Sequence, residues 1–315
     1  MSRLVIGNLD AEIEMARAAT PGPHPDVSPA AARLIRRHAS HLSVFGPLWL
    51  PGAPPPAALL AWAETDSVAA LRSLPVARRP LPVPRLQFSE WTERLWQLHP
   101  APATARACND RRFAFELAQR NGWTLPGARV LTTLDDLPAD ANGHPWIAKA
   151  IFSAAGRERA RFASRDDQRP RLERLLARFG ALLVEPWVDR VLDLGCAGLV
   201  DADAGRIDVF PPHRLDSDAA GVFRAAVIDD SGATVAEPAV LAAVRDSAHA
   251  AGDALAAAGY RGPFSVDAYL WRDRDGAVQL QRMSEVNARL TFGLVARAAA
   301  ERAGSSGGGG FELRL

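Results

Sequence analysis

Lysine is nearly absent from this sequence of 315 residues: of its 37 lysine and arginine residues, only Lys149 is a lysine. The chain is also rich in alanine and proline, which is typical of a coding bias that favours arginine. A single lysine can survive such a bias by chance. The alternative is that the chemistry at position 149 needs a compact ammonium group and excludes a planar guanidinium.

Cysteine and long apolar runs are scarce as well. The two cysteines, Cys108 and Cys196, are too few for a disulfide framework and indicate a reducing compartment. No stretch approaches the roughly 18 uninterrupted apolar residues of a membrane-spanning helix. The first residues hold a short apolar run followed by acidic residues, which does not predict a signal peptide. We therefore expect a soluble, cytoplasmic protein that does not bind membranes.

Net charge is close to zero, because 37 basic and 36 acidic side chains give a formal charge of +1. Such a chain has no positive field that would recruit phosphate backbones, which argues against an electrostatically driven nucleic-acid binder. A hydrophobic content of 48% argues against a disordered protein. At this length we expect about two domains.

Several common motifs are missing from the sequence. There is no G-x-x-x-x-G-K-[ST] phosphate loop and no G-x-G-x-x-G fingerprint between a strand and a helix. There is also no G-x-S-x-G elbow and no H-E-x-x-H. His38 and His41 have a spacing found in zinc sites but lack further ligands, so they do not predict a metal centre.

The order of apolar segments and turn residues predicts a mixed chain of strands and helices. Alternation in the first hundred residues indicates a small α/β domain with parallel strands. The predicted strands are 4–6, 42–45, 128–132, 146–151, 181–187, 192–200, 207–209, 222–228, 262–271, 278–283 and 311–315. The predicted helices are 9–19, 29–38, 57–64, 110–120, 170–179, 238–258 and 294–302, and a further helical stretch holds Trp91 and Trp96. Proline clusters between residues 73 and 102 indicate a domain boundary.

A first chemical segment places Lys149 on a strand that leads into the small-residue loop 153–157. Small residues allow backbone N–H groups to approach phosphate oxygens, and a lysine adds a point charge. In the second segment, an apolar strand ends in Glu185-Pro-Trp187-Val188, with Asp193 shortly after it. The aromatic strand end provides a flat apolar surface and backbone groups that can contact a purine. The acid a few residues later can accept hydrogen bonds from ribose hydroxyls. Taken alone, the first segment is a weak signal, and a buried strand that ends in a solvated acid is the better explanation of the second.

The third segment is a hairpin that carries Asp267, Glu285 and Asn287. Glu285 and Asn287 are two residues apart on one strand and therefore share a face. A turn centred near residues 274 and 275 places Asp267 opposite Met283, diagonal to Glu285. Oxygen ligands without cysteine or histidine suit Mg²⁺ bound to phosphate. The alternative, a solvated outer face, fits poorly with the apolar residues on either side.

With these residues in place, the chain resembles the ATP-grasp superfamily of ATP-dependent carboxylate–amine ligases over about residues 106–303. The run from Glu285 through Asn287 and Arg289 to Gly293 is the most specific part. The resemblance implies a fold of α/β and α+β type with three parts. An N-terminal α/β domain (1–104), of the kind that precedes this module, is followed by a small lobe (105–180) and a large lobe with the metal site (181–315).

The resemblance also implies a role for each matching residue. Lys149 would contact ATP phosphates and act in catalysis, and Asp267, Glu285 and Asn287 would bind Mg²⁺. Arg289 would bind the reacting carboxylate or acyl phosphate. The family often has a lysine after Asn-Asp, whereas Asn109-Asp110 is followed here by Arg111. The remaining residues implied to bind ATP are Arg111, Ser153, Gly156, Arg157, Glu185, Trp187, Val188 and Asp193, with Asp189 as the alternative to Asp193 at the ribose.

The function implied by the resemblance is that of a ligase that activates a carboxylate as an acyl phosphate and joins it to an amine. Amino acids or peptides would be its small-molecule partners, and a homodimer is left open. Two alternatives remain at this stage. One is a non-catalytic ATP-binding module, and the other is an ATP-grasp enzyme with a non-amine acceptor.

Overall fold

The structure is a computed structural model of the chain. The residues it describes are 5–6, 48–49, 90–95, 98, 100–138, 145–152, 158–164, 166–217, 223–228, 236–302 and 311–314. The chain divides into two compact units, one made of Met1–Ala11 and Pro23–Thr92, the other of Glu12–Gly22 and Glu93–Leu315.

In the first unit, the described residues include two short strands. Strand β1 (Val5–Ile6) pairs in parallel with β2 (Leu48–Trp49). Strand β1 and the parallel pairing agree with the expected α/β domain, whereas β2 was not predicted. The predicted strand 42–45 and the three predicted helices between residues 9 and 64 lie outside the described residues. The layout of this domain therefore stays a prediction.

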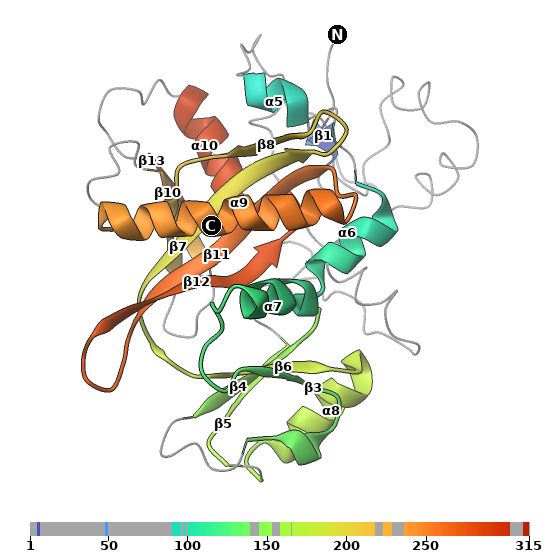
Figure 1. The fold of residues 1–315 in the computed structure, drawn as a ribbon, viewed down its shortest axis with the longest axis vertical. Coiled ribbons are helices and arrows are strands. Elements are labelled where there is room, and N and C mark those ends of the chain that lie inside the picture. The colour runs from blue at the N-terminus through green and yellow to red at the C-terminus, as the bar shows by residue number, and fades with distance from the viewer. Residues whose placement is uncertain are drawn as a thin grey trace. The chain divides into compact units, whose positions relative to one another are not determined.

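A four-stranded antiparallel sheet forms the first layer of the second unit, with strand order β3-β6-β4-β5. Helix α8 packs against this sheet (Figure 1) through Leu172, which is buried with Leu182 and Val184. Gly180 ends α8 in the left-handed conformation, at a φ of 74°, which a glycine adopts without strain. The elements are β3 (Arg129–Leu131), β4 (Trp146–Ala150), β5 (Arg159–Phe162), α8 (Arg169–Phe179) and β6 (Leu182–Pro186).

A larger antiparallel sheet of seven strands follows, in the order β12-β11-β7-β9-β10-β13 with β8 paired to β7. Helix α9 lies across this sheet (Figure 1) and buries Val244, Ala248 and Leu255 against Phe264 and Val266. The strands are β7 (Asp189–Asp201), β8 (Arg206–Val209), β9 (His213–Ser217), β10 (Phe223–Ile228), β11 (Gly262–Arg272), β12 (Val278–Asn287) and β13 (Phe311–Arg314). The other elements are α5 (Glu90–Leu95), α6 (Pro102–Asn109), α7 (Arg111–Arg120), the 3₁₀ turn η2 (Leu134–Asp136), α9 (Pro238–Ala257) and α10 (Phe292–Arg302).

Every strand and helix predicted beyond residue 105 is present within a few residues of its expected bounds. Helix α6 was not predicted, because its prolines were interpreted as a domain boundary. Pro102 instead occupies the first turn of a helix, where its missing N–H costs nothing. Strands β5 and β9 were also not predicted, since arginine, histidine and aspartate interrupt their apolar alternation.

The β11–β12 hairpin corrects the predicted register. Tyr269 pairs with Gln281 as a turn near residue 275 requires, but Asp267 then pairs with Glu285 and not with Met283. The ladder is irregular between Asp267 and Tyr269. Because this shift equals two residues, the side chains stay on the expected face, and Glu285 lies directly opposite Asp267.

A fully buried histidine gives the large sheet a testable pH dependence. Gly195 and Gly293 leave room for His213, because a Cβ at either position would lie 2.7 Å and 2.2 Å, respectively, from its Nε2. Burial and the nearby Arg297 lower the pKa of His213 to about 3. Unfolding raises that pKa toward its ordinary value of 6.5, so the unfolded chain binds the extra proton between these pH values.

We therefore expect the contribution of His213 to the free energy of unfolding to fall as pH drops from about 6.5 toward 3, by about 1.4 kcal/mol per pH unit. Urea denaturation at several pH values would measure this slope. The His213→Gln variant removes the titrating group and should have a shallower slope than the wild type between pH 6 and 4. Equal slopes in the two proteins would contradict the prediction.

Candidate active site

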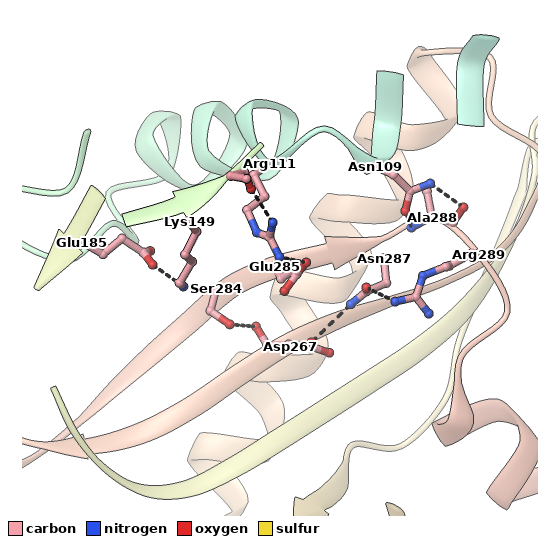
Figure 2. Close-up of polar contacts among 11 residues, drawn as sticks. Asn109, Arg111, Lys149, Glu185, Asp267, Ser284, Glu285, Asn287, Ala288 and Arg289 are labelled. Carbon is pink, nitrogen blue, oxygen red and sulfur yellow. Dashed lines mark hydrogen bonds and ion pairs between the residues drawn. The ribbon is translucent and has the colours of Figure 1, made fainter. Parts of the chain in front are cut away.

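Two carboxylates and an amide lie together on the β11–β12 hairpin (Figure 2). Asp267 and Glu285 are directly opposite each other, and Asn287 follows on the same face of β12. The Asn287 Nδ2 group donates to Asp267 Oδ2 at 3.2 Å, and Ser284 Oγ donates to the Asp267 backbone carbonyl at 3.0 Å. Burial and the charge of Glu285 raise the pKa of Asp267 to about 7. The structure thus brings the three predicted metal ligands into one cluster.

The donor set of this cluster fits a hard divalent cation. Its carboxylate and amide oxygens are the ligands that Mg²⁺ accepts, and no thiolate or imidazole belongs to it. Across the described ranges, no group of three or more His, Cys, Asp and Glu side chains gathers to hold a metal. A metal at Asp267 and Glu285 would therefore depend on Asn287 and on oxygens from a ligand.

Arg289 lies beside this cluster, two residues after Asn287. Its guanidinium donates to Asn287 Oδ1 at 2.9 Å, and its positive charge lowers the pKa of Asp267, opposing the larger effect of burial. Arg289 therefore places a cation near the Asp267 carboxylate. This position fits the expected role of holding an anionic group, which stays a prediction.

Arg111 connects the cluster to the smaller sheet. Its guanidinium donates to the backbone carbonyl of Ala150 at the end of β4 and pairs with Glu285 Oε1 at 2.9 Å (Figure 2). Its backbone N–H donates to the Ile151 carbonyl at 3.0 Å. The side chain is only 8% exposed, and α7 begins at this residue with Asp110 as its N-cap. Arg111 contacts a carboxylate in this state, so its role toward a phosphate stays a prediction.

Lys149 and Glu185 form a buried ion pair on neighbouring strands of the smaller sheet. Lys149 Nζ donates to Glu185 Oε2, and the two side chains are 14% and 7% exposed. The strands β4 and β6 place Ile147 opposite Glu185, so Lys149 reaches its partner diagonally. A buried pair of this kind holds both groups in fixed positions and loses stability when either partner is removed.

A cleft of about 1530 Å³ lies between the smaller sheet and the hairpin end of the larger sheet. Five of the residues predicted to bind ATP line it: Lys149, Glu185, Trp187, Val188 and Asp193. Ligand pockets of about 300–1,000 Å³ bury most of a small molecule, so a nucleotide has ample room here. Ser153, Gly156 and Arg157, which were also predicted to bind ATP, lie outside the described residues.

Other residues of the cleft were not predicted. Arg161 stacks over the Trp187 ring at 4.9 Å, and Arg190 stacks over Tyr269 at 3.9 Å. Arg190 also donates to Asp193 Oδ1 at 3.2 Å. Burial, followed by the charge of Glu185, raises the pKa of Tyr269 and keeps its phenol neutral. Tyr269 could have been identified, because it lies two residues after Asp267 on the same strand face.

No protein-family model matches the sequence, and no curated protein matches it. Among the described residues, no helix has the length and apolar character needed to cross a membrane.

Three solved structures illustrate what the chain is similar to. Carboxyaminoimidazole ribonucleotide synthase from Aspergillus clavatus, complexed with ATP, is 17% identical over 62% of this chain and 48% of its own, with a TM-score of 0.46. The biotin carboxylase domain of Hydrogenobacter thermophilus 2-oxoglutarate carboxylase is 15% identical over 61% and 42%, with a TM-score of 0.47. L-amino acid ligase from Bacillus licheniformis is 19% identical over 67% and 48%, with a TM-score of 0.44.

The likeness to these three structures concerns the fold alone. The chain spans less than half the length of each of the three. At such low identity and TM-score, the likeness assigns no activity to this chain. Its function has to be argued from its own side chains.

Proposed function

We propose that this protein is an ATP-dependent ligase that activates a carboxylate as an acyl phosphate and joins it to an amine, releasing ADP and phosphate. The observation that carries the proposal is the cluster of Asp267, Glu285 and Asn287 with Arg289 beside it. All-oxygen ligands next to a cation suit the transfer of a phosphoryl group to a carboxylate, which depends mainly on positioning and charge neutralisation.

In this proposal the cleft binds the nucleotide. Lys149 contacts phosphate oxygens, and Glu185 and the backbone near Trp187 and Val188 hold adenine. Asp193 binds the ribose. Their common position along one cleft, with Lys149 and Glu185 already paired, supports this assignment. The proposal also assigns phosphate binding to Arg111, Ser153, Gly156 and Arg157.

Asp267, Glu285 and Asn287 would hold Mg²⁺ in the proposed enzyme. When bound, the ion neutralises phosphate charge and so favours attack at phosphorus. Arg111 contacts Glu285 and Arg289 contacts Asn287, so both arginines restrict where these side chains can point. The ligands are therefore held by groups whose charge also suits an anionic substrate.

The proposed chemistry has two steps. An oxygen of the substrate carboxylate, oriented by Arg289, attacks the γ-phosphorus of ATP, and the bond from this phosphorus to the β–γ bridging oxygen breaks. The bridging oxygen leaves with ADP, and an acyl phosphate remains. The amine nitrogen then attacks the acyl carbon, phosphate leaves with the bonding electrons, and the nitrogen loses a proton. Exclusion of water by the nucleotide cleft would protect the acyl phosphate from hydrolysis.

The substrates proposed are a small carboxylic acid and an amine, of amino-acid or peptide type. We infer that an N-terminal domain at residues 1–104 contributes to the selection of these substrates. The proposed small lobe covers residues 105–180, and the proposed large lobe covers residues 181–315. The protein would act as a soluble cytoplasmic enzyme, as a monomer or homodimer, without nucleic acid.

ADP release tests the proposal directly. The purified protein would be incubated with Mg²⁺ and ATP against pooled amino acids and small carboxylic acids, with and without amines. We expect one pool to release ADP and phosphate in equal amounts and to yield a product whose mass equals two components minus water. ADP release without condensation would favour a non-amine acceptor. ATP binding without any turnover would favour the non-catalytic module and contradict the proposal.

A further inference from the structure

The side chain of Asn109 forms two hydrogen bonds with the backbone of Ala288, which lies between two residues of the proposed site; we call this pair of bonds the clamp. The Asn109 side chain lies at the end of α6, and its Nδ2 group donates to the Ala288 carbonyl at 3.0 Å (Figure 2). The Ala288 N–H in turn donates to Asn109 Oδ1 at 3.0 Å. A second Nδ2 hydrogen bond, to the Ala105 carbonyl at 2.7 Å, uses the remaining donor. One amide thus pairs with both backbone groups of Ala288, as a neighbouring strand would do.

The clamped residue separates Asn287 from Arg289. Ala288 is 3% exposed, and its neighbours carry the hydrogen bonds that run from Arg289 through Asn287 to Asp267. A shift of the Ala288 backbone would move the side chains of Asn287 and Arg289, because their Cα atoms belong to the peptide groups on either side of Ala288. The clamp therefore fixes the proposed metal ligand and the proposed carboxylate-binding arginine together.

The segment 285–289 is also contacted near its first residue, by a residue at the junction between α6 and α7. Arg111, two residues after Asn109, pairs with Glu285 at 2.9 Å. Asp110 between them accepts a hydrogen bond from the Arg112 N–H at 2.9 Å and begins α7. Three consecutive residues, Asn109 to Arg111, thus fix a helix start and both ends of the 285–289 segment.

We propose that Asn109 is a positioning residue, which acts through Ala288 to hold Asn287 and Arg289 in the geometry needed for phosphoryl transfer to the carboxylate. This inference rests on the proposed function. Asn109 does not line the nucleotide cleft, and its three hydrogen bonds to described residues all go to backbone groups. Its loss should therefore affect turnover more than nucleotide binding.

Asn121 offers a matched control. Its Nδ2 group donates to the Leu117 carbonyl, four residues earlier, at 2.8 Å, just as Asn109 donates to Ala105. Asn121 is the C-cap of α7, and within the described residues its side chain has no hydrogen bond to β12. Asn109→Ala and Asn121→Ala each remove a hydrogen bond from an asparagine side chain to the carbonyl four residues earlier. The difference between the two variants therefore measures the effect of the hydrogen bonds between Asn109 and Ala288.

The experiment combines steady-state kinetics with amide hydrogen exchange of the 285–290 peptide. For Asn109→Ala we expect kcat to fall at least about tenfold while the KM for ATP changes less than about twofold. Exchange at the Ala288 amide should become at least about tenfold faster, because its acceptor is gone. Asn121→Ala should leave kcat, KM and this exchange rate near the wild-type values.

A second variant keeps the test decisive if Asn109→Ala does not fold. Asn109→Asp preserves the shape and the acceptor for the Ala288 N–H but removes both donated bonds, so we expect slower turnover with the Ala288 amide still protected. Equal kcat in the Asn109 and Asn121 variants, or unchanged exchange in Asn109→Ala, would overturn the positioning role. A wild-type protein that releases no ADP with any pool would instead overturn the proposed function, which is a separate result.

Discussion

Replacing Glu285 by glutamine is expected to lower kcat about a thousandfold, with ADP release measured under saturating ATP and substrate. Glu285 lies opposite Asp267 and pairs with Arg111 at 2.9 Å, so its charge serves both the proposed metal and a buried guanidinium. Glutamine keeps the shape and one hydrogen-bond acceptor for Arg111. The variant therefore removes charge with little change in packing.

The matched control for this substitution is Glu173→Gln. Glu173 also pairs with an arginine, Arg169, at 3.0 Å, but on the exposed surface of α8. An exposed pair contributes little to stability, so the control should retain wild-type turnover. Near-normal kcat in Glu285→Gln would exclude this carboxylate from the metal site and leave Asp267 and Asn287 as an incomplete ligand set.

Replacing Lys149 by arginine is expected to weaken ATP binding about 10–100-fold, measured as the Kd for ATP by calorimetry. The substitution keeps the positive charge and changes only the size and hydrogen-bond geometry of the cation. Lys149 is 14% exposed and its two strand neighbours, Ala148 and Ala150, are completely buried. The larger guanidinium would displace either the Glu185 pair or the phosphates.

Arg178→Lys provides the reciprocal control, because Arg178 forms an ion pair with Glu158 at 3.0 Å and does not line the cleft. It should leave the Kd for ATP within about threefold of the wild type, since it keeps the Lys149 pair intact. Unchanged affinity in Lys149→Arg would mean that the single lysine is a chance survivor of the arginine bias.

Local signals were sufficient to predict much of the second unit. The turn between β11 and β12 is an example, because Asp273 accepts hydrogen bonds from the N–H groups of Asp275 and Ala277, and Gly276 adopts a φ of 81°. Asp110 likewise caps α7 as an N-cap aspartate should. In both cases the physical cause lies within a few residues and is visible in the sequence.

The contacts that could not be predicted join distant parts of the chain. Arg111 and Glu285 are 174 positions apart, and Asn109 and Ala288 are 179 apart. No short-range pattern identifies such partners, so Arg111 was assigned to phosphate by resemblance and Asn109 was interpreted only as part of a helix start. The irregular register next to Asp267 was also hidden, because nothing in the Met283–Glu285 stretch distinguishes a regular ladder from a bulged one.

The irregular pairing between β11 and β12 determines which insertions and deletions in β12 would keep Glu285 and Asn287 on the face that carries Asp267. Between the Tyr269–Gln281 and Asp267–Glu285 pairs, β12 uses four residue steps where β11 uses two. Deleting one residue from β12 there would place Glu285 and Asn287 on the opposite face of the sheet, whereas deleting two would keep Glu285 opposite Asp267 and make the ladder regular. Lineages that keep this cluster should therefore gain or lose residues in this stretch only in pairs.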